Sequence, residues 1–281
     1  LGRTLQATGH LEEAVTTYRK GLQIDPGYAT IYDNLAGALC NQGRHEEAVE
    51  NHRRVLQLTP NDSIAHSNLL LTLHYMPEQN PGEMFAEHQR WAQAHAQTPP
   101  ARLSYANSCD ADRRLRVGYV SSDFRAHSVA FFFEPLLANH DKNAVETFCY
   151  SGAPRYDATT ERLRGLAAQW RNINGLMDNQ VVQMIRDDRI DILVDLAGHT
   201  AGNRLKVFAR KPAPVEVTYL GYPDTTGLPV IDCRFTDTLA DPPGQEAFYT
   251  EKLLRLPGGF LCYQPLAESP PVAPLPALTA G

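Results

Sequence analysis

The chain has 281 residues, more than one average domain of about 100–200 residues, so its length allows two domains. Its 26 Lys and Arg residues against 32 Asp and Glu residues give a formal charge of −6, which argues against nucleic acid as the main partner. Apolar residues make up 43% and charged residues 21%, as in folded globular proteins, so we do not expect disorder. The longest apolar stretch, residues 129–138, is too short to cross a bilayer, so we expect no membrane segment.

A repeat of 34 residues opens the chain. Residues 9–15 (Gly-His-Leu-Glu-Glu-Ala-Val) return as residues 43–49 (Gly-Arg-His-Glu-Glu-Ala-Val), and Pro26 returns as Pro60. The glycine at the start of each copy fits the turn between two helices, and the proline ends the second helix. A period of this length with this content is typical of tetratricopeptide repeats (TPR), helical hairpins that stack into an array. We therefore predict TPR repeats over residues 1–75.

The repeat weakens after its second copy. Residues 61–75 predict one more first helix, and residues 82–96 predict a partner helix that departs from the repeat. We assign residues 76–114 to this transition helix and a linker rich in small and polar residues. His88 and His95 lie on one helix face and could share a metal ion, but no third ligand is evident. Histidines packed beside apolar residues are the favoured interpretation, and we expect no metal site.

From residue 115 onward, predicted strands alternate with predicted helices. The strands are expected at residues 115–120, 145–151, 170–173, 190–196, 215–220, 233–236 and 253–256, and the helices at residues 128–139, 157–168, 177–188 and 202–209. This alternation predicts a parallel sheet covered by helices on both faces. The fold class is therefore α + α/β, with TPR helical repeats followed by a doubly wound, Rossmann-like parallel-sheet lobe over residues 115–264. The Pro-rich residues 265–281 predict a linker to a further domain.

Three loops leave the carboxyl ends of predicted strands, where ligands bind in open parallel sheets. They are residues 121–127, which lead to a helix that Ser128 could cap, residues 197–202 and residues 220–227. They supply two histidines, several hydroxyls, and glycines that let backbone amides approach a ligand. An imidazole can take or orient a hydroxyl proton, and helix N-termini with loop amides can stabilise a departing diphosphate without a metal. These residues suit transfer of an activated group to an acceptor hydroxyl.

Other common catalytic motifs are missing from the sequence. It has no GxGxxG, GxxxxGK[ST] or GxSxG pattern, which disfavours NAD binding, P-loop chemistry and α/β-hydrolase chemistry. The five cysteines are odd in number, lie far apart and form no CxxC pair, which favours reduced thiols and a cytoplasmic protein.

Asn34 and Asn68 occupy equivalent positions in successive first helices. Amide side chains at such positions can line the inner groove of a helical array and hydrogen-bond an extended peptide backbone. They can equally satisfy polar groups of the neighbouring helix, and the sequence alone leaves both interpretations open.

Three segments resemble bacterial homologues of O-linked N-acetylglucosamine transferase, in which a TPR array also precedes the catalytic domain. They are residues 115–124 with His127 and Ser128, residues 195–204, and residues 212–223, the last with Leu-Gly-Tyr-Pro at its end. The resemblance implies an inverting two-lobed (GT-B) glycosyltransferase that transfers N-acetylglucosamine from UDP-GlcNAc to Ser or Thr hydroxyls of proteins, with no metal ion or other cofactor. This chain would be the acceptor-side half of that enzyme, with residues 115–264 as its N-terminal lobe and the C-terminal nucleotide-binding lobe missing.

The resemblance also implies roles for individual residues. It gives His127, Asp123 and His199 as catalytic residues, with His127 as general base or donor contact. The substrate-binding residues would be Thr200, Leu220, Gly221, Tyr222, Pro223 and Thr225. The acceptor-peptide groove would be formed by Asn34 and Asn68. Expected partners are acceptor proteins or peptides, a UDP-sugar and the missing lobe, with no nucleic acid and no membrane. Asp224 departs from the family pattern, which often has Gly there, and could restrict close backbone approach or place a charge near the site.

Alternatives remain open for several of these residues and for the function. His127 would otherwise be a polar residue at a helix start, Asp123 a loop anchor and His199 a loop residue without a catalytic role, while packing is the favoured role of His74. The competing functions are a non-enzymatic TPR adaptor that binds peptides, and a GT-B transferase that uses another sugar nucleotide.

Overall fold

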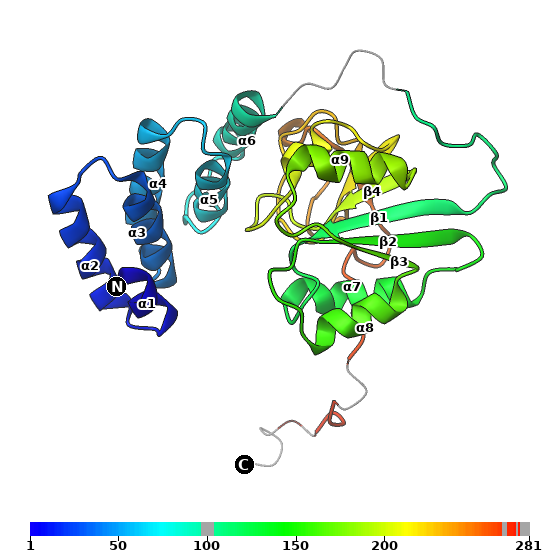
Figure 1. Ribbon diagram of the computed structural model, residues 1–281, viewed down its shortest axis with the longest axis horizontal. Coiled ribbons are helices and arrows are strands. Elements are labelled where there is room, and N and C mark those ends of the chain that lie inside the picture. Colours follow the sequence, from blue (N-terminus) through cyan, green and yellow to red (C-terminus); the bar gives the residue numbers. More distant parts are fainter. Residues whose placement is uncertain (97–103, 266–268, 274, 276–281) are drawn as a thin grey trace.

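The computed structural model describes residues 1–96, 104–265, 269–273 and 275. Residues 97–103 of the predicted linker, and residues 266–268, 274 and 276–281 of the predicted Pro-rich segment, lie outside the described residues. A helical array precedes a sheet lobe, as Figure 1 shows. The predicted fold class is confirmed. Among the described helices, none is both long and apolar enough to span a bilayer.

The array consists of antiparallel helical hairpins. Its helices are α1 (Gly2–Ala7), α2 (Leu11–Ile24), α3 (Ala29–Asn41), α4 (His45–Leu58), α5 (Ser63–Leu73) and α6 (Pro81–His95). Gly9 and Gly43 have φ angles of 82° and 75° at the turns, a conformation that glycine adopts without strain. Ala14 and Ala48 are fully buried, so neighbouring helices approach closely. The predicted hairpins are present, and the transition helix α6 begins after Asn80, whose side chain accepts hydrogen bonds from the amides of Gly82 and Glu83.

The lobe is built on seven parallel strands in the order β3-β2-β1-β4-β5-β6-β7. The strands are β1 (Leu115–Ser121), β2 (Val145–Ser151), β3 (Gln169–Asn172), β4 (Ile192–Asp195), β5 (Val215–Thr218), β6 (Cys233–Thr236) and β7 (Lys252–Arg255). Between them lie α7 (Ser128–Ala138), α8 (Ala158–Leu166), α9 (Asp178–Asp187), α10 (Leu205–Phe208) and a 3-10 helix, η1 (Glu246–Phe248). The strand order turns at β1, so the crevice expected in doubly wound sheets lies beside this strand.

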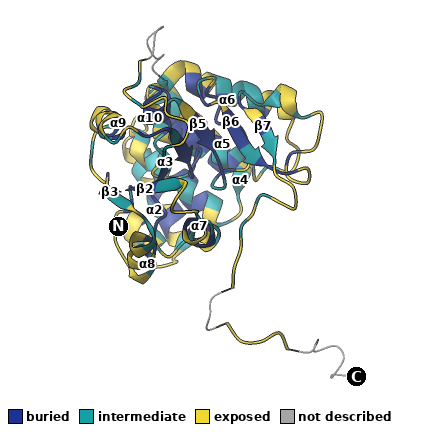
Figure 2. Ribbon diagram, turned by 90° about the vertical axis from the view of Figure 1, so that its right-hand side faces the viewer, coloured by how far each residue is buried: buried dark blue, intermediate teal, exposed yellow. Residues whose placement is uncertain are grey.

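The sheet is covered on both faces. Val117 and Tyr119 of β1 pack with α7 and α8, whereas Val120 packs on the opposite face with α9 and α10, as the alternation of side chains along a strand requires. Figure 2 shows the buried strands enclosed by helices whose outer faces are exposed. The predicted helix at residues 202–209 is shorter, because Gly202 has a φ of 75° that a helix does not contain, and α10 begins only at Leu205.

The last hairpin of the array shares its core with the lobe. Leu70 of α5 and Trp91 of α6 belong to the same buried cluster as Val120 and Leu193 of the sheet. The Trp91 indole N–H also donates to the carbonyl of Ser63 at 3.0 Å, which ties α6 to α5. Because apolar side chains of both parts exclude water together, this hairpin is fixed against the carboxyl edge of the sheet.

Candidate functional site

The first loop after β1 sets His127 beside a buried carboxylate. His127 is the N-cap of α7, where its Nδ1 accepts the amide N–H of Val129 at 3.3 Å. The prediction that Ser128 caps this helix is wrong, since Ser128 is its first helical residue. The Nε2 atom of His127 lies 3.8 Å from Oδ1 of Asp123, which is 6% exposed and also bound by Arg125. Because Nδ1 accepts, the proton of the neutral ring lies on Nε2, so in this conformation the ring presents a donor.

The second loop is organised by Asp195, at the end of β4. This fully buried carboxylate accepts the amide N–H groups of Ala197 at 3.1 Å and Gly198 at 2.8 Å, and the hydroxyl of Thr218 at 3.0 Å. Burial raises the pKa of Asp195 to about 6, because loss of water outweighs the three hydrogen bonds that favour its charged form. This role was not predicted from the sequence, although a carboxylate at the end of an apolar strand, just before a glycine turn, could have indicated it.

His199 lies inside the protein, between the last hairpin and the lobe. It is 1% exposed, its Nε2–H donates to the carbonyl of Thr226 at 2.9 Å, and its Nδ1 accepts from the hydroxyl of Ser67 at 3.1 Å. Its ring meets that of Trp91 edge to face, with 4.8 Å between centroids. Burial lowers its pKa well below the usual value, so the ring is neutral. With both nitrogens bonded, His199 connects α5 to two loops of the lobe.

The third loop divides the predicted substrate-binding residues. Leu220, with a φ of 73°, Gly221 and Pro223 lie at or near the surface, whereas Tyr222 and Thr225 are buried. A Cβ atom on Gly221 would lie 1.9 Å from the carbonyl oxygen of Leu196, so only glycine fits between this loop and the second one.

Buried polar contacts fix the position of the third loop on its inner side. Thr225 donates its hydroxyl proton to Glu251 at 2.6 Å, and the Tyr222 hydroxyl lies 2.9 Å from His74 and from His88. Tyr222 and Thr225 therefore face the protein interior.

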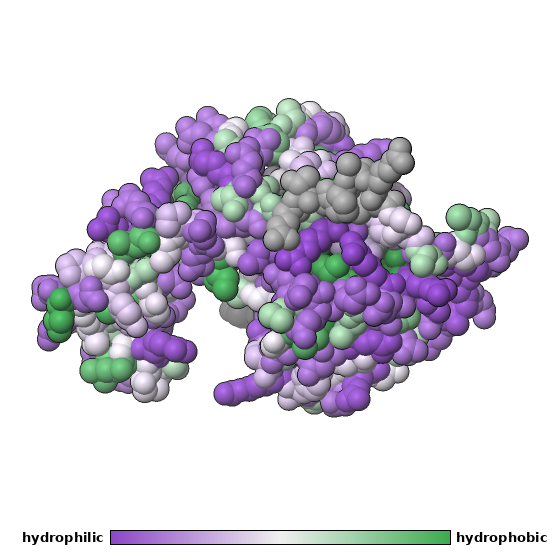
Figure 3. Space-filling model, turned by 45° about the horizontal axis from the view of Figure 1, so that its top comes forward, coloured by the Kyte–Doolittle hydropathy of each residue, from purple (hydrophilic) through white to green (hydrophobic). Residues whose placement is uncertain are grey.

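A polar cavity of about 490 Å³ joins the array to the second loop. From the array it is lined by Ser63, Ile64, Ser67, Asn68 and Trp91, and from the lobe by Gly152, Asn174, Met177, Asp178, Thr200, Ala201, Gly202, Asn203, Arg204 and Lys206. Two predicted site residues, Asn68 and Thr200, thus border one space. Figure 3 shows a hollow between the array and the lobe on one face of the molecule.

The cavity brings together groups that the sequence did not connect. Asn68 gives one amide proton to Asp33 at 3.2 Å, so it contacts the neighbouring helix and also lines the cavity. On the opposite wall, Arg204 is held by Asp178 at 3.0 Å, and Lys206 lies beside the same carboxylate. Neither basic residue was predicted from the sequence to lie at the site. Asn34 lies half-buried on α3, and His127 is not among the residues that line this cavity.

Comparison with known proteins identifies relatives of both parts. The model of Glycosyl transferase family 41 matches residues 95–264, and TPR models match residues 2–43 and 29–59. The "Probable UDP-N-acetylglucosamine--peptide N-acetylglucosaminyltransferase SPINDLY" of Oryza sativa subsp. japonica is 43% identical over 221 residues, which cover 77% of this chain and 24% of that protein. The "UDP-N-acetylglucosamine--peptide N-acetylglucosaminyltransferase" of Caenorhabditis elegans is 36% identical over 151 residues, which cover 53% of this chain and 13% of that protein.

A solved structure is similar over nearly the whole chain. A mutant of the Thermobaculum terrenum O-GlcNAc transferase matches with a TM-score of 0.92 and 38% identity, covering 98% of this chain and 53% of that one. This chain therefore spans about half of the solved protein and about a quarter of the plant relative.

Proposed function

We propose that this chain, which belongs to glycosyl transferase family 41, forms the TPR array and N-terminal lobe of a protein O-GlcNAc transferase. The enzyme would transfer N-acetylglucosamine from UDP-GlcNAc to Ser or Thr hydroxyls of proteins, with inversion at the sugar. The names of the plant and nematode relatives support this donor and a peptide acceptor. A second lobe, which would bind the nucleotide and complete the cleft, is part of the proposal.

One observation carries the proposal: the polar cavity bordered by Asn68 of the array and Thr200 of the second loop. A peptide bound along the inner face of the array would reach the carboxyl edge of the sheet through this space. Asn68 has a second amide proton and a carbonyl oxygen besides the bond to Asp33, and both suit a peptide backbone. Asn34, one repeat earlier, would extend the same contact. Because these side-chain amides would bind the peptide backbone and not its side chains, the enzyme would accept many sequences around the modified hydroxyl.

The chemistry we propose is direct displacement. The acceptor oxygen would form a bond to the anomeric carbon as the bond from that carbon to the diphosphate oxygen breaks, and the hydroxyl proton would pass to a phosphate oxygen of the departing diphosphate. Loop amides near Leu220 and Gly221, together with the N-terminus of α7, would stabilise the departing negative charge without a metal ion. His127 stands at that N-terminus with a proton on Nε2, which suits contact with the donor diphosphate, and Asp123 orients the ring.

The buried members of the predicted set take a supporting role in this proposal. His199 and Tyr222 join the last hairpin to the loops, and Thr225 fixes the third loop through Glu251. They would act as positioning residues, whereas Thr200 and Pro223 remain available at the surface.

Transfer of labelled sugar from UDP-GlcNAc to a peptide by the full-length protein tests the proposal. We expect His127→Ala to lose most of the transfer, and Asn68→Ala to raise KM for the peptide with little change in kcat. His10→Ala, at an exposed position near the start of α2, is the matched control. Full turnover by His127→Ala would refute the role of this residue. Peptide binding without turnover of any sugar nucleotide would support an adaptor, and preference for another donor would assign a different transferase.

A further inference from the structure

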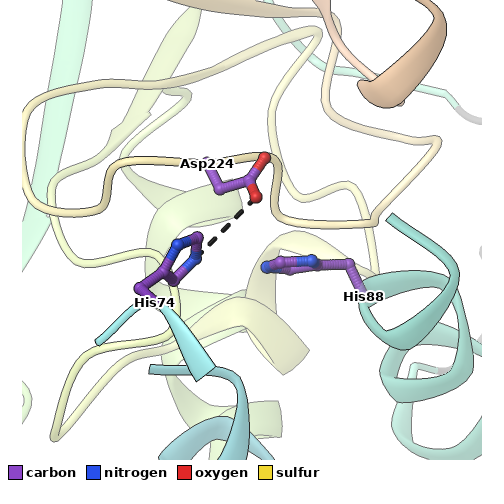
Figure 4. A group of neighbouring side chains, drawn as sticks. All are labelled: His74, His88 and Asp224. Carbon is purple, nitrogen blue, oxygen red and sulfur yellow. Dashed lines mark ion pairs between the residues drawn. The ribbon is translucent and has the colours of Figure 1, made fainter. Parts of the chain in front are cut away.

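Three potential metal ligands converge where the array meets the third loop. His74 follows the C-terminus of α5, His88 lies on α6, and Asp224 lies in the loop after β5. One ligand atom from each, two imidazole nitrogens and a carboxylate oxygen, all lie within 4.8 Å of one another. Nε2 of His74 is 3.8 Å from Oδ2 of Asp224. Figure 4 shows the three side chains facing a common space.

The surrounding structure orients these atoms toward that space. The Nδ1–H group of His88 donates to the carbonyl of Met84 at 2.7 Å, which leaves the lone pair of Nε2 directed into the cluster. A backbone carbonyl on the far nitrogen is the usual partner of a metal-bound histidine. Oδ1 of Asp224 accepts the amide N–H of Thr225 at 2.7 Å, and this leaves Oδ2 for the cluster. Both arrangements supply the outer hydrogen bonds that a metal site needs.

The electrostatic surroundings also suit an ion. A cationic group beside the cluster, Arg234, donates to the carbonyls of Tyr222 and Asp224, and its charge is balanced by Asp241 at 3.1 Å. The carboxylate of Asp224 thus remains available to offset the charge of a bound cation.

We infer that His74, His88 and Asp224 form a binding site for a divalent transition-metal ion, with zinc as the best fit. Two imidazoles and one carboxylate form a common zinc set and are poorly suited to magnesium or calcium, which prefer oxygen ligands. A four-coordinate zinc ion keeps its ligand atoms roughly 3.4 Å apart, so binding requires a modest inward shift. His74 and Asp224 have partly exposed side chains that can make it. The hydroxyl of Tyr222, 2.9 Å from both histidines, or a water molecule would complete the shell.

An ion at this position would connect three parts of the chain. It would join the end of α5, helix α6 and the loop that carries Leu220 and Gly221. Without metal, the Tyr222 hydroxyl makes a weaker connection, donating to Nε2 of His88 and accepting from Nε2–H of His74. Metal binding requires the His74 proton to lie on Nδ1, which frees Nε2 as a ligand. A metal site here differs from the expectation, drawn from the sequence, that the chain has no metal site. The pair considered in the sequence was His88 with His95, whereas in the structure His95 contacts His66 at 3.1 Å. The proposed metal site does not depend on the proposed sugar transfer.

Calorimetric titration of the chelator-treated full-length protein with zinc chloride tests the inference. We expect one zinc ion per chain at this site, with affinity reduced about tenfold or more in both His74→Gln and Asp224→Asn. His95→Gln, which removes a histidine of the neighbouring pair, should bind zinc as the unaltered protein does. His88→Gln is a less useful variant because His88 is fully buried and its loss affects folding.

Cobalt(II) as an optical probe gives an independent readout. A three-ligand protein site with one further ligand should give the intense visible bands of four-coordinate cobalt, and Asp224→Asn should lose them while His95→Gln keeps them. Failure of the unaltered protein to bind zinc at micromolar concentrations would overturn the inference. So would zinc affinities of His74→Gln and Asp224→Asn equal to that of the unaltered protein.

Discussion

Asp195 provides the sharpest physical test of how the second loop is built. Its carboxylate is fully buried, and its pKa of about 6 compares with an ordinary value near 3.9 in an unfolded chain. As the pH rises above 3.9 the unfolded chain releases this proton first, so unfolding becomes more favourable until the folded carboxyl also ionises above pH 6. From these two values, the Asp195 contribution alone lowers the free energy of unfolding by about 1 kcal/mol between pH 5 and pH 7.

The change that isolates this effect is Asp195→Asn. An amide keeps the shape and does not ionise, but it turns an N–H group toward the amide of either Ala197 or Gly198, a cost of about 1–3 kcal/mol. That cost does not vary with pH. We therefore expect the stability of the variant relative to the unaltered protein to improve by about 1 kcal/mol from pH 5 to pH 7. Urea unfolding of the full-length protein at both pH values measures it, with Asp187→Asn at the exposed end of α9 as the control. An equal pH dependence of Asp195→Asn and the unaltered protein would refute the reasoning.

Three further changes test other parts of the structure. Gly221→Ala places a Cβ atom 1.9 Å from the carbonyl oxygen of Leu196, so we expect a lower melting temperature and loss of sugar transfer. The control Gly165→Ala, whose Cβ atom meets nothing within 4 Å, should have the melting temperature of the unaltered protein. Trp91→Ala empties a fully buried position in the shared core and should destabilise the protein by about 3–5 kcal/mol in urea unfolding; a loss below about 1 kcal/mol would argue against a shared core. Arg204→Gln removes a cation from the cavity wall and should weaken the binding of acidic peptides more than that of neutral peptides. Fluorescence anisotropy measures both affinities, and an equal effect on the two kinds of peptide would contradict a role of Arg204 in binding the acceptor.

Most of the fold could be predicted because local patterns determine it. The 34-residue repeat specifies the hairpins through Gly9, Gly43 and the alanines at the helix contacts, and the alternation of strands and helices specifies the parallel sheet. Element ends were less accurate, since a positive φ at Gly202 shortens a helix in a way that helical periodicity does not indicate.

The site was harder to predict because its contacts join residues far apart in the chain. Ser67 meets His199 across 132 positions and His74 meets Tyr222 across 148, and sequence patterns carry no information on such pairs. The three loops at the carboxyl edge could be expected from the topology of the sheet alone. Which of their side chains turn inward depends on how the last hairpin packs, so the burial of His199, Tyr222 and Thr225 could not be read from the sequence.

The most direct test of the proposed function is the structure of the product. The full-length protein should be incubated with UDP-GlcNAc and a Ser- or Thr-containing peptide, and the linkage to the modified side chain determined by NMR. The proposal predicts N-acetylglucosamine on the hydroxyl oxygen in the β configuration, opposite to that in the donor. A retained α configuration, or no sugar on any hydroxyl, would contradict it.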